Sequence, residues 1–185
     1  QRMANRNAHI IDLGNIHVFQ QEYETHFTAL KHFAMQYHPD EEQICDLLQD
    51  IWMKLWEKKE TYINEASFKT YLYRTVRNRM LNFIRDQKIN EERLSQLSFE
   101  ESEDAIINKI IESEIYALIN EAFSELPDSC KRVYLESLKG ASQKEIAEKL
   151  NISINTIKKH INNANHYLKK RLENILSLLL LLKGY

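Results

Sequence analysis

The sequence predicts an all-α protein of two small helical domains joined by a flexible acidic linker, with a helix-turn-helix in the C-terminal domain. Three observations support this fold class. Apolar residues recur every three or four positions through most of the chain, which is typical of amphipathic helices. The 185 residues include only three glycines and two prolines, too few for a hairpin-rich protein. One stretch rich in glutamate lacks this periodicity and divides the chain.

Two helices are predicted on either side of Pro39. The first carries the apolar stripe Phe19, Tyr23, Phe27, Leu30, Ala34 and Tyr37. The second carries the stripe Ile44, Leu47, Leu48, Ile51, Trp52, Leu55 and Trp56. Other residues of the second helix recur at three- and four-residue steps away from this stripe. They predict an exposed, mostly acidic ridge formed by Asp46, Gln49, Asp50, Met53 and Glu57.

A third helix is predicted to begin after Ser67, which has the chemistry of an N-cap. Its apolar stripe is Phe68, Tyr71, Leu72, Val76, Met80, Phe83 and Ile84. The opposite side is expected to be exposed and basic, with an aromatic ring and two amides among the charges: Lys69, Tyr73, Arg74, Arg77, Asn78, Arg79, Asn82 and Arg85. Such a face either is simply solvated or contacts nucleic acid.

The periodicity fades after Asp86 and returns at Ile107, and the residues between them are rich in glutamate. We therefore expect a first domain over 12–88, an acidic linker over 89–105 and a second domain over 106–177. A leucine-rich tail, 178–185, follows as the end of a helix. Its leucines either pack locally or form a surface for a partner or lipid, because five consecutive leucines cannot all face one core.

The most specific local pattern is a helix, a tight turn and a second helix. Gly140 stands where a left-handed residue would end one helix, and Ser142 and Glu145 have the spacing of a capping box that begins the next. Ser153 is expected to cap a further helix that begins at Ile154. In such a unit the second helix enters the DNA major groove, which is wide enough to admit it. The expected contacts are Asn155, Thr156, Lys158 and Lys159.

Composition restricts the function. A formal net charge of -2 is incompatible with a uniformly basic surface, so any DNA binding must be local. Cys45 and Cys130 match no metal-binding spacing and suit buried thiols in the reducing cytoplasm. The sequence has no HExxH, GxSxG or phosphate-binding glycine loop, so we expect no enzyme, metal or cofactor. The leucine run is far shorter than the ~20 apolar residues of a membrane span, so no membrane insertion is expected.

Together the two halves resemble an extracytoplasmic-function (ECF) sigma factor, a small bacterial promoter-specificity subunit of RNA polymerase that carries only sigma domains 2 and 4. Residues 46–56 are similar to the polymerase-binding helix of the family, and residues 67–78 to its promoter-melting segment. In the C-terminal half the similar residues are Leu126-Pro127, Arg132-Val133, Gly140-Ala141-Ser142 and Glu145-Ile146-Ala147. A histidine at position 160 departs from the family pattern.

The resemblance implies a role for each charged surface. The ridge of Asp46, Gln49, Asp50 and Met53 would dock on the clamp helices of the largest subunit of core RNA polymerase. The -10 promoter element would be held by Tyr73, Arg74, Arg77 and Asn78. The -35 element would be held by Arg132, Lys144, Asn155, Thr156, Lys158 and Lys159. It also implies a contact with the flap of the second-largest subunit and an inhibitory anti-sigma factor.

Two other classes of protein are alternatives to this interpretation. An enzyme has little support, because paired carboxylates such as Asp46 and Asp50 lie on a surface face and no catalytic motif accompanies them. A stand-alone dimeric helix-turn-helix regulator would share the C-terminal pattern. Binding to a palindrome without polymerase would favour that regulator.

Overall fold

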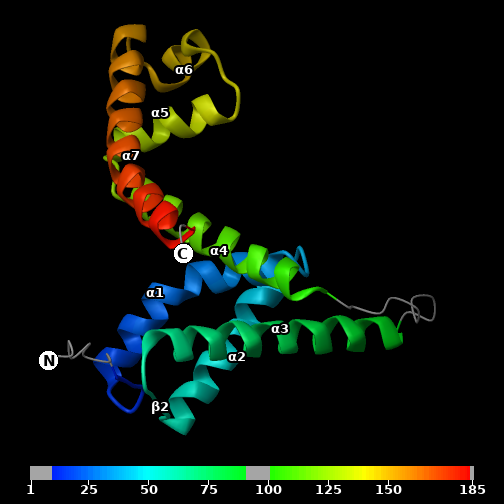
Figure 1. Ribbon diagram of the computed structural model, residues 1–185. Coiled ribbons are helices and arrows are strands. Elements are labelled where there is room, and N and C mark those ends of the chain that lie inside the picture. The colour runs from blue at the N-terminus through cyan, green and yellow to red at the C-terminus, as the bar shows by residue number, and fades with distance from the viewer. Residues whose placement is uncertain (1–9, 91–100, 184–185) are drawn as a thin grey trace, which may run out of the picture. The chain divides into compact units, whose positions relative to one another are not determined.

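The structure, a computed structural model, describes residues 10–90 and 101–183, with side chains to Gln87 in the first range and Glu173 in the second. It confirms the all-α class (Figure 1). In chain order the elements are β1 (Ile11–Asp12), α1 (Ile16–Met35), α2 (Glu41–Lys58), β2 (Thr61–Tyr62), α3 (Glu65–Asn90), α4 (Glu103–Ser124), α5 (Asp128–Leu138), α6 (Gln143–Leu150) and α7 (Ile154–Lys183). The chain forms two compact units, residues 1–117 and 118–185.

Unit 1 is built on α1, α2 and α3, which pack against one another around an aromatic core. The predicted apolar stripes supply this core. Phe33, Leu48, Phe68 and Leu72 are fully buried, and the Trp52 ring meets the Tyr23 ring edge-on with 5.3 Å between centroids. Interlocked aromatic rings of this kind fix the angle between helices, because each ring fills a specific gap.

The segment between α2 and α3 differs from the sequence expectation. Thr61 pairs with Asp12 and Tyr62 with Ile11 in a short antiparallel ladder. Strands of two residues are too short to be predicted from periodicity. The third helix also begins earlier than Ser67. The Asn64 side chain accepts a hydrogen bond from the Ser67 amide at 2.8 Å, so the expectation that Ser67 is the N-cap is wrong.

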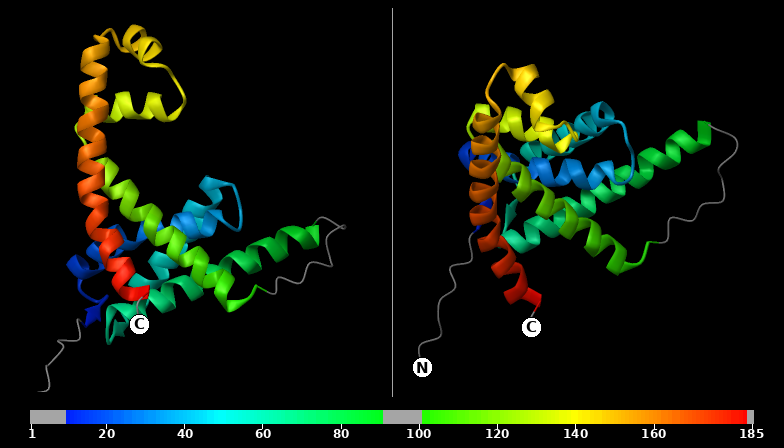
Figure 2. Two further views of the ribbon diagram at one scale, coloured as in Figure 1. Left: turned by 45° about the horizontal axis from the view of Figure 1, so that its top comes forward. Right: turned by 90° about the horizontal axis from the view of Figure 1, so that it is seen from above.

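Unit 2 contains α5 and α6 packed on α7, as both views of Figure 2 show. Its innermost side chains are Val133, Ile146 and Ile157, one from each helix. Cys130 is buried, as expected, with its sulfur 3.2 Å from Nδ1 of His160. Cys45 in unit 1 is only half-buried, so the expectation of a buried thiol is wrong there. Three apolar side chains in contact are a small core, so the helix termini contribute a large share of what fixes this unit.

The residues predicted to end and begin the helices of the helix-turn-helix are confirmed in these roles. Gly140 has a φ of +88°, a conformation that only glycine adopts without strain. The Ser142 hydroxyl accepts from the Glu145 amide at 3.3 Å, while the Glu145 carboxylate accepts from the Ser142 amide at 2.7 Å. Asn151 makes the left-handed turn that follows, and the Ser153 hydroxyl accepts from the Thr156 amide at 3.1 Å.

Because α6 is a short helix, its cap is expected to matter for the whole unit. Replacing Ser142 with alanine should destabilise unit 2 by about 1 kcal/mol, since the Glu145 amide loses its acceptor. Thermal unfolding followed by circular dichroism measures the loss. Ser129→Ala, at an exposed serine in the first turn of α5, is the matched control and should leave the transition unchanged. An equal shift in both variants would contradict a specific capping role.

Along the chain, the boundary between the two compact units falls after residue 117, whereas the sequence predicts the linker at 89–105. Residues 91–100 of that linker lie outside the described residues. Residues 101–117, here called the strap, belong to unit 1 and pack against its other elements through the contacts described below. Residues 178–183 of the tail form the end of α7, as expected, but their side chains and residues 184–185 lie outside the described residues. Over 10–90 and 101–183, no helix is long and apolar enough to cross a membrane.

Candidate polymerase-binding ridge and nucleic-acid interface

The predicted ridge on α2 is exposed along its length. Asp46, Gln49 and Asp50 are exposed, and Met53 retains 59% of its accessible surface. None of the described residues forms an ion pair with the two aspartates. The opposite side of the same helix buries Leu48, Ile51 and Trp52. The ridge therefore presents free carboxylates on a rigid helix, which is suited to charge-assisted hydrogen bonds with arginines of a partner.

Two hollows flank the ridge, and neither was predicted from the sequence. On the α1 side, a shallow groove of about 390 Å³ is lined by Phe19, Tyr23, Gln49, Trp52, Met53, Trp56 and Glu57. On the α3 side, a cleft of about 370 Å³ is lined by Gln43, Asp46, Leu47, Asp50, Arg79, Asn82, Phe83 and Asp86. The ridge thus lies between an aromatic surface and a polar one. Only the packing of α1 and α3 against α2 creates these hollows, so the pattern along one helix cannot reveal them.

The basic side of α3 divides into two rows at four-residue steps. Arg74 and Asn78 form an exposed row. Lys69, Tyr73 and Arg77 form a second row, and strap residues cover it. The sequence predicts both rows to be exposed, and for the second row this is wrong. Tyr73 in particular retains only 5% of its accessible surface.

Glu114 of the strap binds two residues of this second row. Its carboxylate accepts a hydrogen bond from the Tyr73 hydroxyl at 2.6 Å and one from Lys69 Nζ at 3.0 Å. The Tyr73 ring packs edge-on against Phe33, with ring centroids 5.0 Å apart. Burial, reinforced by the charge of Glu114, raises the pKa of the Tyr73 hydroxyl well above its ordinary value. Tyr73 is therefore held as a neutral hydrogen-bond donor.

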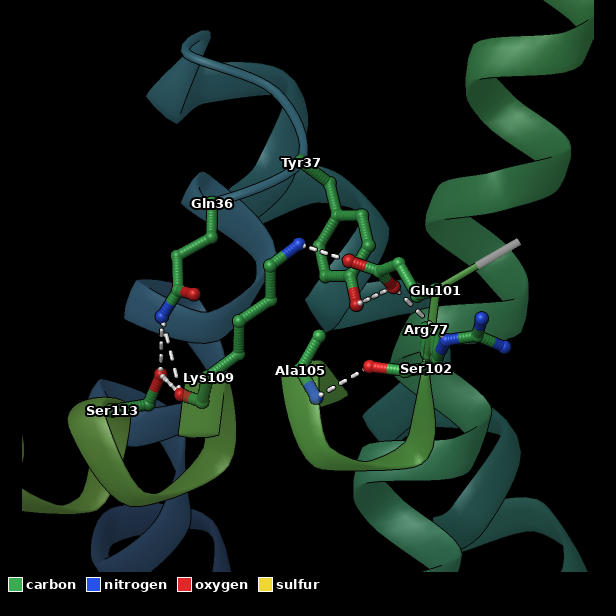
Figure 3. A network of polar contacts seen from close by, with 8 residues as sticks. All are labelled: Gln36, Tyr37, Arg77, Glu101, Ser102, Ala105, Lys109 and Ser113. Atoms are coloured by element: carbon green, nitrogen blue, oxygen red, sulfur yellow. Dashed lines mark hydrogen bonds and ion pairs between the residues drawn. The ribbon is translucent and has the colours of Figure 1, made fainter. Parts of the chain in front are cut away.

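Glu101 makes a second set of contacts, shown in Figure 3. Its carboxylate accepts from the Tyr37 hydroxyl at 2.9 Å and from Arg77 Nε at 3.4 Å, and it also pairs with Lys109. The ammonium group of Lys109 lies 3.9 Å from the centre of the Tyr37 ring. Burial opposes ionisation of Glu101, but the hydrogen bonds from Lys109 and Tyr37 outweigh it and hold the pKa of this carboxyl below its usual range.

The helix-turn-helix presents most of its predicted contacts to solvent. Asn155, Lys158 and Lys159 are exposed on the first turns of α7. Arg132 on α5 and Lys144 on α6 are exposed as well. Thr156 differs, because it is half-buried and its hydroxyl lies 2.9 Å from that of Ser153. Its side chain belongs to the helix cap, so the structure gives it a local role beside any contact with DNA.

Two segments of the chain match known protein families, and most of its length is similar to characterised proteins. Residues 23–89 match the family of sigma-70 region 2, and residues 116–164 match that of sigma-70 region 4. The chain is 30% identical over 135 residues to the RNA polymerase sigma factor SigZ of Bacillus subtilis, covering 72% of this chain and 75% of SigZ. It is 23% identical over 163 residues to the ECF RNA polymerase sigma factor SigX of the same organism, covering 84% of each.

The chain is also similar to a third sigma factor and to a solved structure. The ECF RNA polymerase sigma-E factor of Haemophilus influenzae is 24% identical over 148 residues, covering 72% of this chain and 76% of that protein. The structure of CnrH in complex with the cytosolic domain of CnrY is 21% identical in sequence and aligns over 87% of this chain and 91% of that one, with a TM-score of 0.33.

Proposed function

Because this chain belongs to the extracytoplasmic-function sigma factors, which bind core RNA polymerase and direct it to promoters, we propose one task for each of its three charged surfaces. The α2 ridge binds polymerase, the basic side of α3 binds the -10 element, and the first turns of α7 read the -35 element. Sigma factors are specificity subunits rather than catalysts, so no reaction is assigned. Because they act on cytoplasmic polymerase, we place the chain in the cytoplasm.

The exposure of the ridge is the observation that carries the first assignment. Asp46 and Asp50 are unpaired among the described residues, although basic side chains are abundant in unit 1. A monomer gains nothing from leaving two aspartates together on one face, since like charges repel. Arginines on the clamp helices of the largest subunit would compensate that charge. The aromatic groove beside Met53 offers the same partner an apolar contact.

The assignment to the -10 element depends on residue chemistry. Arg74 and Asn78 are exposed and lie one helical turn apart, so they face the same way. Arginine pairs with backbone phosphate, and the asparagine amide both donates to and accepts from the edge of an unpaired base. Arg77 and Tyr73 can join them only after the strap residues that bind them have moved.

The assignment to the -35 element rests on α7. Asn155 and Lys158 are exposed directly after the Ser153 cap, where a recognition helix carries its base contacts. Arg132 and Lys144 on the other two helices offer phosphate contacts on either side. The contact with the polymerase flap and the anti-sigma factor implied by the family remain predictions for which this chain supplies no geometry.

The experiment for the -35 assignment uses holoenzyme reconstituted from this chain and bacterial core polymerase. A Lys158→Ala variant should bind promoter duplex about tenfold more weakly, because one base or phosphate contact is lost. Lys169→Ala removes the same charge further along α7 and is the matched control. Equal loss in both variants would show that α7 binds DNA only through general charge. Tight dimeric binding to duplex DNA without polymerase would instead favour the stand-alone regulator.

A further inference from the structure

The strap occupies the part of α3 that the -10 element would need. Lys69, Tyr73 and Arg77 lie at four-residue steps and so form one continuous row on the helix. Each of them is bound by a carboxylate of the strap, either Glu101 or Glu114. Carboxylate oxygens accept hydrogen bonds from the same donors that would otherwise bind phosphate or base oxygens. The strap therefore satisfies this row in the way a nucleic-acid strand would.

The rest of the strap contacts the C-terminal end of α1 and its C-cap residue Gln36. Gln36 Nε2 donates to the Ser113 hydroxyl at 3.0 Å and to the Lys109 carbonyl at 3.2 Å (Figure 3). The His32 ring stacks on Tyr116 with centroids 4.1 Å apart. Contacts of this kind hold a helix in one register without the large apolar burial that makes a core element permanent.

The apolar side chains of the strap are divided between its two sides, and Ile106 and Ile115 are half-buried. Ile110 packs against the core of unit 1, but Ile107 and Ile111 retain 51% and 42% of their accessible surface. A helix that leaves two of its large apolar residues in solvent gains little hydrophobic stabilisation from its present position. Charge and hydrogen bonds therefore account for much of the attachment of the strap, and a polyanion can replace its carboxylates as acceptors.

We propose that residues 101–117 act as an intramolecular cover, whose carboxylates hold Lys69, Tyr73 and Arg77 until single-stranded promoter DNA displaces them. The inference rests on the assignment of α3 to the -10 element. Its consequence is a lower affinity of the free protein for DNA, because only the fraction of molecules with an open strap can bind. Glu101 and Glu114 are then the residues that set this fraction.

The test measures binding of the full chain to a fluorescent pool of short single-stranded DNA of random sequence. The variant Glu101→Gln/Glu114→Gln keeps the side-chain shape but weakens the acceptors, and it should bind about three- to tenfold more tightly. The control Glu103→Gln/Glu112→Gln removes the same charge from exposed positions of α4 and should bind like the wild type. Equal affinity in the two variants would overturn the proposal, whether both rise or neither does.

Hydrogen exchange of the unmodified chain gives a second readout that requires no variant to fold. Adding the DNA pool should speed exchange of the amides in 103–117, because the strap leaves its place, while amides of α3 become protected. Protection of α3 with no change in the strap would also overturn the proposal. Arg74→Ala separates the two inferences: if this exposed residue proves irrelevant to DNA binding, the -10 assignment itself fails, whereas weaker binding by Arg74→Ala with no gain in the glutamine variant refutes only the cover.

Discussion

Replacing Asp50 with arginine is expected to weaken the binding of this sigma factor to core RNA polymerase about a hundredfold. Asp50 lies exposed in the middle of the ridge, where its carboxylate is expected to meet arginines of the clamp helices. The substitution removes that attraction and places two positive charges against each other. Titration of a labelled chain with core polymerase at fixed ionic strength measures the change, since salt screens such contacts.

A matched reversal distinguishes a docking contact from a general charge effect. Glu24→Arg changes the net charge by the same amount at an exposed position of α1 in the same unit. It should bind polymerase like the unmodified chain, and run-off transcription should fall only with Asp50→Arg. If both variants lose affinity equally, the ridge is not the docking surface. If neither does, the polymerase contact lies elsewhere on the chain.

The elements that could be predicted from sequence are those set by residues close together in the chain. Helical periodicity depends on neighbours three and four positions apart, and it located the ridge around Asp50 correctly on the exposed side of α2. The capping box of Ser142 and Glu145 and the left-handed Gly140 are equally local. All three therefore appear in the structure as the pattern predicts.

The features that sequence could not supply depend on distant partners. Tyr73 flanks the apolar stripe of α3, and periodicity alone leaves it at the border between buried and exposed. Tyr73 belongs to the core of unit 1, where its ring meets Phe33 and its hydroxyl binds Glu114 of another helix. The contacts of Glu101 depend on distant partners in the same way, because its charge suggested solvation whereas Tyr37, Arg77 and Lys109 bind it. An acidic composition does not reveal a nearby basic row.

The second large effect concerns unit 2, where Ile157→Ala is expected to cost about 2–5 kcal/mol of stability. Ile157 is fully buried. It is the residue of α7 in the small apolar cluster that also contains Val133 and Ile146. The lost methyl groups leave a cavity that the surrounding side chains refill only in part. Small domains have stabilities near the lower end of about 5–15 kcal/mol, so much of unit 2 should unfold. Recognition of the -35 element should be lost with it.

The positions of the tryptophans make this outcome easy to separate from global unfolding. Trp52 and Trp56 both lie on α2, so tryptophan fluorescence reports on unit 1, whereas circular dichroism reports on the helices of both units. In Ile157→Ala, the circular dichroism signal should begin to fall at a lower temperature, while the fluorescence transition stays at the temperature of the unmodified chain. Binding to core polymerase through the ridge should persist. Ile154→Ala, at a neighbour that retains 42% of its accessible surface, should change stability by less than about 0.5 kcal/mol. A fluorescence transition that moves together with the helical one would mean that the two units unfold as a single cooperative body, and polymerase binding would then fall along with promoter recognition.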